Sequence, residues 1–228
     1  MAVPGNNHHE SICITKQDLR AKYTGASNTL DMRIKRALKT QKLLKLKNGL
    51  YITSTAYLHE LDKIKFTEFI ASRMYEPSYI SLEYVLEKHG LLLPQPNRSI
   101  TCMTTKTGRT FKNLLGVYTY TNIKPLLFTG FEEQTFNGHA YHIATKDKAL
   151  FDYLYLNPNL ARRNAKQLKH QLFNELNIQW TYFSEQDFEA FSKFVWQSDS
   201  AKMQKIWHIL NAHFENKKFD EWARELLK

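Results

Sequence analysis

The sequence predicts an α+β protein with an N-terminal winged helix-turn-helix over residues 1–60, followed by a mixed α/β domain with a helical C-terminal bundle over residues 61–228. Three observations predict this architecture. Two short helical patterns precede a hairpin signal near the N-terminus, and segments rich in Thr, Tyr and Val lie in the middle of the chain. After Pro158, apolar residues recur at helical spacing, so we expect the mixed part to end at about residue 157.

Length and composition set the class of protein. The chain has 228 residues, of which 43% are hydrophobic and 24% are charged, so neither a disordered chain nor a coiled-coil rod is expected. No apolar run approaches the roughly 20 residues of a membrane-spanning helix. Residues 1–16 lack a basic region followed by an apolar one, so we expect no secretory leader. Cys13 and Cys102 are the only cysteines and lie far apart, which fits reduced thiols. We therefore expect a cytoplasmic protein that does not contact a membrane.

The positive charge is concentrated in the first quarter of the chain. Residues 1–59 contain ten basic and three acidic residues, a net charge of +7, whereas the other 169 residues carry 22 basic and 19 acidic ones, a net of +3. A concentrated cationic surface attracts polyanions, because neutralising phosphates releases condensed counterions. Charge alone does not separate DNA, RNA and anionic lipid, or any of them from a surface that is basic for solubility.

Two helices are predicted in this basic region. Thr15 and Asp18 form a capping-box-like start for a helix to about Tyr23, and Ser27 or Asn28 caps a second helix that runs to Lys42. Leu30, Ile34, Ala37 and Leu38, with Gln41 after them, recur at the spacing of one helix face. Basic residues lie off this stripe, so the helix should bury one face and present a cationic one.

A β-hairpin is predicted directly after the second helix. Residues 43–47 and 50–53 alternate in polarity and flank Asn48-Gly49, which favours a type I′ turn. Helix, turn, basic helix and hairpin in this order are typical of a winged helix-turn-helix, whose second helix enters the major groove of DNA. The predicted DNA-contacting residues are Ser27, Asn28, Arg33, Lys35, Arg36, Lys39, Lys42, Lys45, Lys47 and Asn48. A winged helix that contacts only another protein is the alternative.

The larger domain shows a mixture of helix and strand signals. We expect a helix over residues 65–75, a second helix that Ser78 caps and Gly90 ends, and two antiparallel strands over 99–105 and 110–120. A strand at 141–144 should precede a helix that begins at Thr145 and ends at Leu156. In the tail, the predicted apolar stripes are Phe188, Phe191, Phe194 and Val195; Ile206, Ile209 and Leu210; and Phe219, Trp222, Ala223 and Leu226.

Signals of catalysis are weak, and we predict no catalytic residue, no metal and no cofactor. The sequence has no phosphate-binding Gly-rich loop and no zinc-protease or serine-hydrolase motif. His139, His142, Asp147 and Asp152 form the one cluster that a metal-dependent nuclease would use, but its spacing is loose. Lys148 and Asp152 fit a helical i, i+4 ion pair better, with Lys146 and Lys148 exposed. Cys102 lies within an alternating strand pattern and is expected in the core.

Three segments resemble the AbiEi antitoxin family, the transcriptional regulators of abortive-infection type IV toxin–antitoxin operons. Lys45–Tyr51 is similar to the end of the family's wing, in which a basic residue and a turn precede Gly, an aliphatic residue and Tyr. Tyr79–Leu91 resembles the pattern YISLESAL..HGL, and Ile143–Asp152 resembles IA(S/T)PEKALLD, with Lys146-Asp147 in place of Pro-Glu. The helix that usually precedes the helix-turn-helix in the family has little room before Thr15.

The resemblance implies a function in phage defence. A member of this family would be a DNA-binding transcriptional repressor that binds the double-stranded operator of its own operon. It would also be the antitoxin that counters a nucleotidyltransferase-like toxin, with no stable complex required. A protein-interaction module without sequence-specific DNA binding is the alternative, and a nucleic-acid enzyme is the third possibility.

Overall fold

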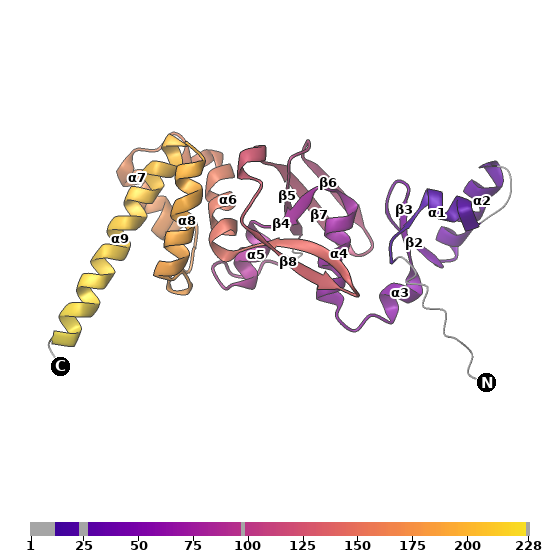
Figure 1. The fold of residues 1–228 in the computed structure, drawn as a ribbon, viewed down its shortest axis with the longest axis horizontal. Helices are drawn as coiled ribbons and strands as arrows, with labels where there is room; N and C mark the ends of the chain where they lie inside the picture. The colour runs from indigo at the N-terminus through magenta and orange to yellow at the C-terminus, as the bar shows by residue number, and fades with distance from the viewer. Residues whose placement is uncertain (1–11, 23–26, 97–98, 227–228) are drawn as a thin grey trace.

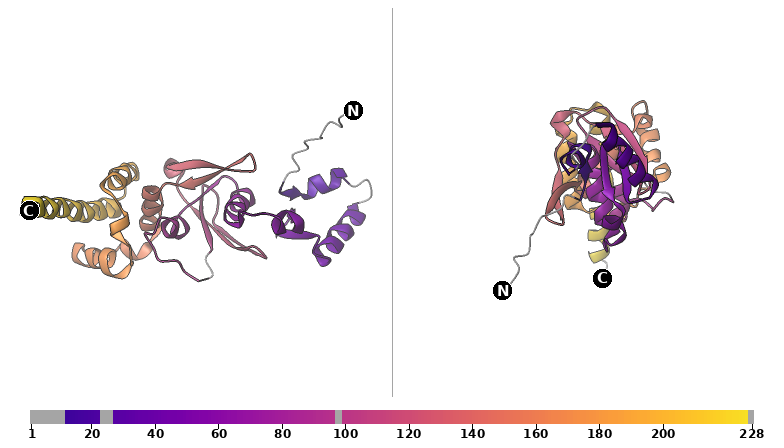
Figure 2. Two further views of the ribbon diagram at one scale, coloured as in Figure 1. Left: turned by 90° about the horizontal axis from the view of Figure 1, so that it is seen from below. Right: turned by 90° about the vertical axis from the view of Figure 1, so that its right-hand side faces the viewer.

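The computed structural model describes the backbone of residues 12–22, 27–96 and 99–226, and the side chains of these ranges except those of 27–28 and 216–226. The molecule is elongated, with a small N-terminal sheet and its helices at one end, a mixed sheet in the centre and helices at the other end (Figure 1). The view from below shows the same order along the long axis (Figure 2, left). The α+β class predicted from the sequence is confirmed.

The elements follow one another in three groups. The N-terminal group consists of β1 (Ile14–Thr15), α1 (Lys16–Lys22), α2 (Ser27–Lys39), β2 (Leu43–Lys47), β3 (Leu50–Thr53) and α3 (Ser54–Leu58). The central group consists of α4 (Lys63–Met74), β4 (Ser78–Ile80), α5 (Glu83–Lys88), β5 (Ile100–Thr104), β6 (Arg109–Asn113), β7 (Gly116–Asn122), η1 (Pro125–Leu127), β8 (Phe131–Phe136), β9 (His139–Ala144) and α6 (Lys146–Leu156). The tail consists of η2 (Pro158–Leu160), α7 (Ala165–His170), the π-helical turn η3 (Gln171–Glu175), η4 (Trp180–Tyr182), α8 (Glu185–Gln197) and α9 (Ala201–Leu226).

The N-terminal sheet is covered on both faces. Its strands are antiparallel in the order β1-β3-β2. Because successive side chains of a strand point to opposite faces, Tyr51 of β3 packs in a small core with Leu30 and Ile34 of α2. Its neighbours Leu50 and Ile52 belong to the continuous core of the rest of the protein. The helix pair and hairpin are therefore joined to the central part through the sheet.

The central sheet is mixed, in the order β6-β7-β5-β4-β9-β8. The predicted antiparallel pairing of residues 99–105 with 110–120 is wrong, because β5 pairs with β7 in parallel. The second segment contains two strands, since the chain turns within it and β6 pairs back onto β7. At this turn, the Asn113 side-chain oxygen accepts from the Leu115 backbone N–H at 2.8 Å, and Gly116 adopts a φ of 145°.

Ser78 does not cap a helix, contrary to the sequence prediction. Ser78–Ile80 forms β4, which lies between β5 and β9 in the middle of the sheet. Tyr79 and Ile80 are fully buried there, so burial on both faces overrides the helical spacing of this segment. The helix begins only at Glu83, and Gly90 ends it with a φ of 75° as predicted.

The hairpin of β8 and β9 was predicted only in its second half. β9 includes the expected strand at 141–144, but β8 was not predicted. The two strands join at Asn137-Gly138, where both residues have positive φ values, 47° and 77°. This turn has the backbone conformation that Asn-Gly favours in two-residue hairpins.

Tyrosines of the sheet anchor two helices to it. Tyr141 donates its hydroxyl to the Glu68 carboxylate of α4 at 2.8 Å, and the Tyr120 hydroxyl donates to the Ala71 carbonyl of the same helix. Tyr79 donates to the Asp152 carboxylate of α6 at 2.9 Å. These hydrogen bonds join α4 and α6 to the sheet. The two helices confirm the helices predicted at 65–75 and from Thr145 to Leu156.

Lys148 is buried, so the prediction that it is exposed is wrong. Its ammonium group donates to Asp152 at 2.5 Å, and neither side chain has any solvent exposure. Ser81 also donates to this carboxylate, at 2.8 Å, and the ammonium lies 4.8 Å from the ring centre of Phe151. Lys146 is largely buried and forms an ion pair with Asp187 of α8 at 2.5 Å. The two lysines therefore fasten α6 into the core and onto the tail.

The tail is helical, as predicted. Ser184 begins α8 with a capping box, and Phe188, Phe191 and Val195 are buried while Phe194 is half-buried. Ile206 and Leu210 of α9 are buried as expected, and the third predicted stripe lies among side chains outside the described set. Among the described helices, none combines the length and the apolarity that crossing a membrane requires.

Candidate nucleic-acid interface

Local hydrogen bonds fix the first helix as the sequence predicts. Asp18 accepts from the backbone N–H and the hydroxyl of Thr15, both at 2.7 Å, and Thr15 accepts from the Asp18 N–H in return. These bonds hold the pKa of the Asp18 carboxyl below its usual value. The same end of α1 is tied to its surroundings, because the Lys16 N–H donates to the Gly49 carbonyl and the Lys16 ammonium pairs with Asp31 of α2 at 2.7 Å.

α2 is shorter than predicted and ends at Lys39. Gln41 has a φ of 53°, its N–H donates to the Leu38 carbonyl, and the Lys42 N–H donates to the Ala37 carbonyl. This pair of bonds is a Schellman motif, which closes a helix with a left-handed residue. Gln41 takes the position that Gly usually occupies, so the end of the helix has no recognisable stop signal in the sequence. Lys42 is exposed in the following turn rather than on the helix.

The outward face of α2 is cationic. Leu30 and Ile34 are buried, and at about 100° per residue the position opposite Ile34 falls among Met32, Arg36 and Lys39. Arg33 and Lys35 lie on the two flanks of the helix. All of these outward residues are exposed. Ser27 and Asn28 form the start of α2, but their side chains are outside the described part of the structure.

The hairpin divides its predicted contact residues into two groups. Lys45 and Asn48 are exposed. The Lys47 ammonium donates to the Met74 carbonyl at the end of α4, so it links the hairpin to the central part. The predicted type I′ turn is wrong, because of Asn48 and Gly49 only Gly49 has a positive φ, 78°.

The electrostatic asymmetry persists in the folded N-terminal part. Over residues 12–59 there are ten basic and two acidic residues, a net charge of +8. Both acidic side chains are engaged, Asp18 in the cap of α1 and Asp31 with Lys16. Asp31 is the one acidic residue of α2, so the exposed cations of this helix are not balanced by acidic residues of the helix itself. Such a surface suits a polyanion.

Two features of this surface were not predicted. Met32 is 66% exposed at the centre of the outward face of α2, where an apolar group can contact a thymine methyl. The spacing of Met32 from Leu30 and Ile34 places it off the buried stripe, so its exposure could have been predicted from the sequence. Folding also brings Lys106 and Arg109 near Lys47. Burial is the largest cause of a lowered pKa of Lys47, and the two cations lower it further. The carboxylate of Glu76 has the opposite effect.

The histidine and aspartate cluster of the larger domain does not assemble a site. His139 stacks on Phe69 with ring centres 5.6 Å apart, and His142 packs against Phe131 at 4.8 Å. Asp152 is held by Lys148 in the core. Over the part of the chain that the structure describes, no three His, Cys, Asp or Glu residues are grouped as a metal site requires. Cys102 is fully buried, and burial raises the pKa of its thiol, so it is a core residue as predicted.

No model of a known protein family matches the chain. A search of curated proteins likewise finds no similar one.

Proposed function

We propose that this protein is a sequence-specific double-stranded DNA-binding transcriptional repressor that reads DNA with α2 and contacts the backbone with its β2–β3 hairpin. The N-terminal group of elements is then a winged helix-turn-helix, in which β1 and the hairpin form the three-stranded sheet. The exposed cationic face of α2, set opposite its buried stripe, is the observation that supports this proposal most strongly.

Within this proposal, the predicted contact residues take different roles. Arg36 lies opposite the buried stripe and is best placed for bidentate pairing with a guanine edge. Lys39 and the exposed Lys42 and Lys45 fit phosphate contacts, because a lysine carries a compact point charge on a flexible stem. Lys47 holds the hairpin on α4 through the Met74 carbonyl. Replacing Lys47 should therefore act mainly by changing the orientation of the hairpin, and only secondarily by removing a positive charge.

A second function has an observation in its favour. Leu58 at the end of α3, Leu61 in the connection and Ile64 at the start of α4 are all exposed. Exposed apolar residues in one short segment are typical of protein contacts. A winged helix that binds a partner protein is therefore the alternative. Competition with duplex DNA separates the two functions. Excess unlabelled duplex should displace a labelled duplex from a DNA-binding protein, whereas it should leave the binding of a partner protein unchanged.

The antitoxin role follows from the resemblance to the AbiEi family. The Tyr79–Leu91 and Ile143–Asp152 segments that carry the resemblance meet in the core. Tyr79 and Ser81 of the first segment both donate to Asp152 of the second. Residues that match the family pattern thus contact one another in the core. On the resemblance, we propose that the protein autoregulates a type IV operon and counters a nucleotidyltransferase-like toxin.

Two experiments test these functions separately. Selection of duplexes from a random library, followed by a promoter reporter that carries the selected site, tests repression. Recovery of no preferred duplex would refute sequence-specific binding. Co-expression with a nucleotidyltransferase-like toxin encoded beside this gene tests the antitoxin role by growth. Growth arrest that the protein does not relieve would refute the antitoxin role and leave the DNA-binding proposal standing.

A further inference from the structure

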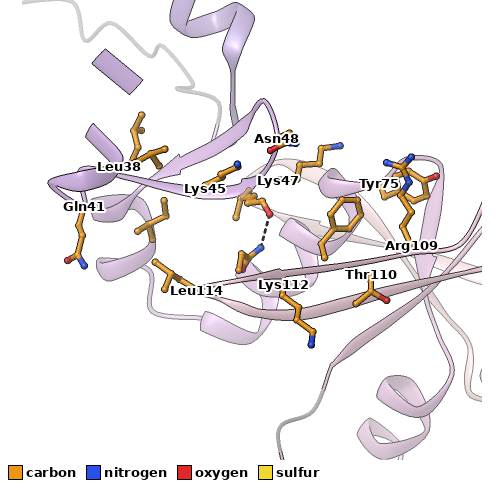
Figure 3. A pocket seen from close by; sticks show the side chains of 15 residues that line it. Leu38, Gln41, Lys45, Lys47, Asn48, Tyr75, Arg109, Thr110, Lys112 and Leu114 are labelled. Atoms are coloured by element: carbon orange, nitrogen blue, oxygen red, sulfur yellow. Dashed lines mark hydrogen bonds between the residues drawn. The ribbon is translucent and has the colours of Figure 1, made fainter. Parts of the chain in front are cut away.

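A cleft of about 880 Å³ lies between the hairpin and the central sheet. β2 is an edge strand of the N-terminal sheet and β6 is an edge strand of the central one, and the two strands form the walls (Figure 3). The volume falls in the range of small-molecule sites, which often lie where two parts of a protein meet.

The two ends of the cleft differ in chemistry. Leu38 and Leu114 line one end (Figure 3), and Leu114 is 78% exposed there. Lys47, Tyr75 and Arg109 lie together at the other end, as Figure 3 shows. The Arg109 guanidinium lies 5.8 Å from the ring centre of Tyr75. The cleft is therefore amphipathic along its length, with one apolar end and one cationic end.

The lining of the cleft determines the charge of its ligand. None of the lining residues within the described chain is acidic, whereas Lys45, Lys47, Arg109 and Lys112 all line it. The Lys47 ammonium is already bound to the Met74 carbonyl and lies near Glu76. A neutral apolar ligand would supply no counter-charge to Arg109. An anion would be attracted to the Arg109 end, because a guanidinium donates several N–H groups in a fixed geometry.

The middle of the cleft determines the size and shape of its ligand. The Asn113 side-chain amide of β6 donates to the Leu46 carbonyl of β2 at 3.1 Å. A peptide strand inserted between β2 and β6 would need about 4.8 Å of separation on each side, and this bridge holds the strands too close for it. A compact molecule that lies beside the bridge fits the observed geometry.

We propose that this cleft binds a small organic anion with an apolar body, its anionic group beside Arg109 and its apolar body against Leu38 and Leu114. The proposal does not rest on DNA binding, but the two sites share Lys45, which lines the cleft and is also a proposed phosphate contact. A bound anion would contact β2 and β6 together and so fasten the hairpin to the central sheet. Binding to the folded state alone also stabilises it in proportion to the logarithm of ligand concentration.

The test uses the full chain and 8-anilinonaphthalene-1-sulfonate, an anionic aromatic probe, with N-phenyl-1-naphthylamine as the uncharged comparison. We expect saturable binding of the anionic probe at one site, with a rise in melting temperature. Arg109→Gln should weaken the anionic probe about tenfold and the neutral probe little, whereas Arg109→Lys should retain most of the affinity. Leu114→Asp should weaken both probes.

Matched variants outside the cleft serve as controls. Lys124→Gln removes an exposed cation and Leu126→Asp changes a leucine that is 67% exposed, and neither residue lines the cleft. Both should bind the probes like the original chain. Equal affinity for the anionic probe in Arg109→Gln and Lys124→Gln would overturn the proposal. Unchanged probe binding in Arg109→Gln together with weaker binding of a short DNA duplex would assign the cleft to the phosphate backbone and overturn it as well.

Discussion

Replacing Lys45 with alanine should make duplex binding less sensitive to salt, whereas replacing Lys47 should leave that sensitivity unchanged. Both lysines lie on β2, but Lys45 is exposed and the Lys47 ammonium is bound to the Met74 carbonyl. Each phosphate that a cation neutralises contributes about −0.9 to the slope of log K against log salt concentration. Lys45→Ala should therefore reduce the magnitude of the slope by about 1.

The predicted contact residues also set the largest slope that they can give in the unmodified protein. The exposed cations of α2, the following turn and β2 are Arg33, Lys35, Arg36, Lys39, Lys42 and Lys45. If all six neutralised phosphates, the slope would be about −5, and a smaller magnitude is expected because some of them contact bases. Fluorescence anisotropy of a labelled duplex at several potassium chloride concentrations measures the slope, with Lys124→Ala as the control. A change of slope in Lys47→Ala as large as that in Lys45→Ala would refute this reasoning.

Three further predictions concern the scaffold. Asp152→Asn leaves the buried ammonium of Lys148 without its counter-charge and should lower the free energy of unfolding by about 3–5 kcal/mol. Urea denaturation measures this loss, and a loss below about 1 kcal/mol would contradict a stabilising role of the pair. Ser184→Ala removes the cap of α8 and should cost about 1 kcal/mol in the same assay, whereas Ser184→Asp keeps a capping oxygen and should cost much less. Burial and the nearby Lys146 and Lys88 lower the pKa of His89 from its usual 6.5, so the unfolded chain binds this proton first as the pH falls. Stability should therefore decrease below about pH 6.5, and His89→Gln should weaken this dependence; an identical pH profile in the variant would show that His89 is not the cause.

Local features of the N-terminal part were predictable because their determinants are close in sequence. The cap of α1 needs only Thr15 and Asp18, and the buried stripe of α2 depends on spacing within one helix. The end of α2 was missed because Gln41, a residue with no preference for positive φ, closes it. The role of Lys47 was missed because its partner, the Met74 carbonyl, lies in a different helix.

The central sheet was harder to predict because its order depends on long-range pairing. Ile80 pairs in parallel with Ile143, and nothing near either residue in the chain identifies the other as its partner. Burial of both lysine and aspartate in one pair was also unpredictable, since the i, i+4 spacing of Lys148 and Asp152 is equally that of a surface ion pair. The β8–β9 hairpin is different, because Asn137-Gly138 carries its turn signal in the sequence.

The central claim is that the outward face of α2 reads DNA sequence, and the affinity ratio between a selected duplex and its scrambled counterpart tests it most directly. The duplex comes from random-library selection with the unmodified protein, and Arg36→Ala is compared with Lys45→Ala by anisotropy at one salt concentration. We predict that Arg36→Ala lowers this affinity ratio about tenfold or more. Lys45→Ala should lower the affinity for both duplexes by the same factor and leave the ratio unchanged. An unchanged ratio in Arg36→Ala, with the variant folded, would contradict the assignment of α2 as the reading helix.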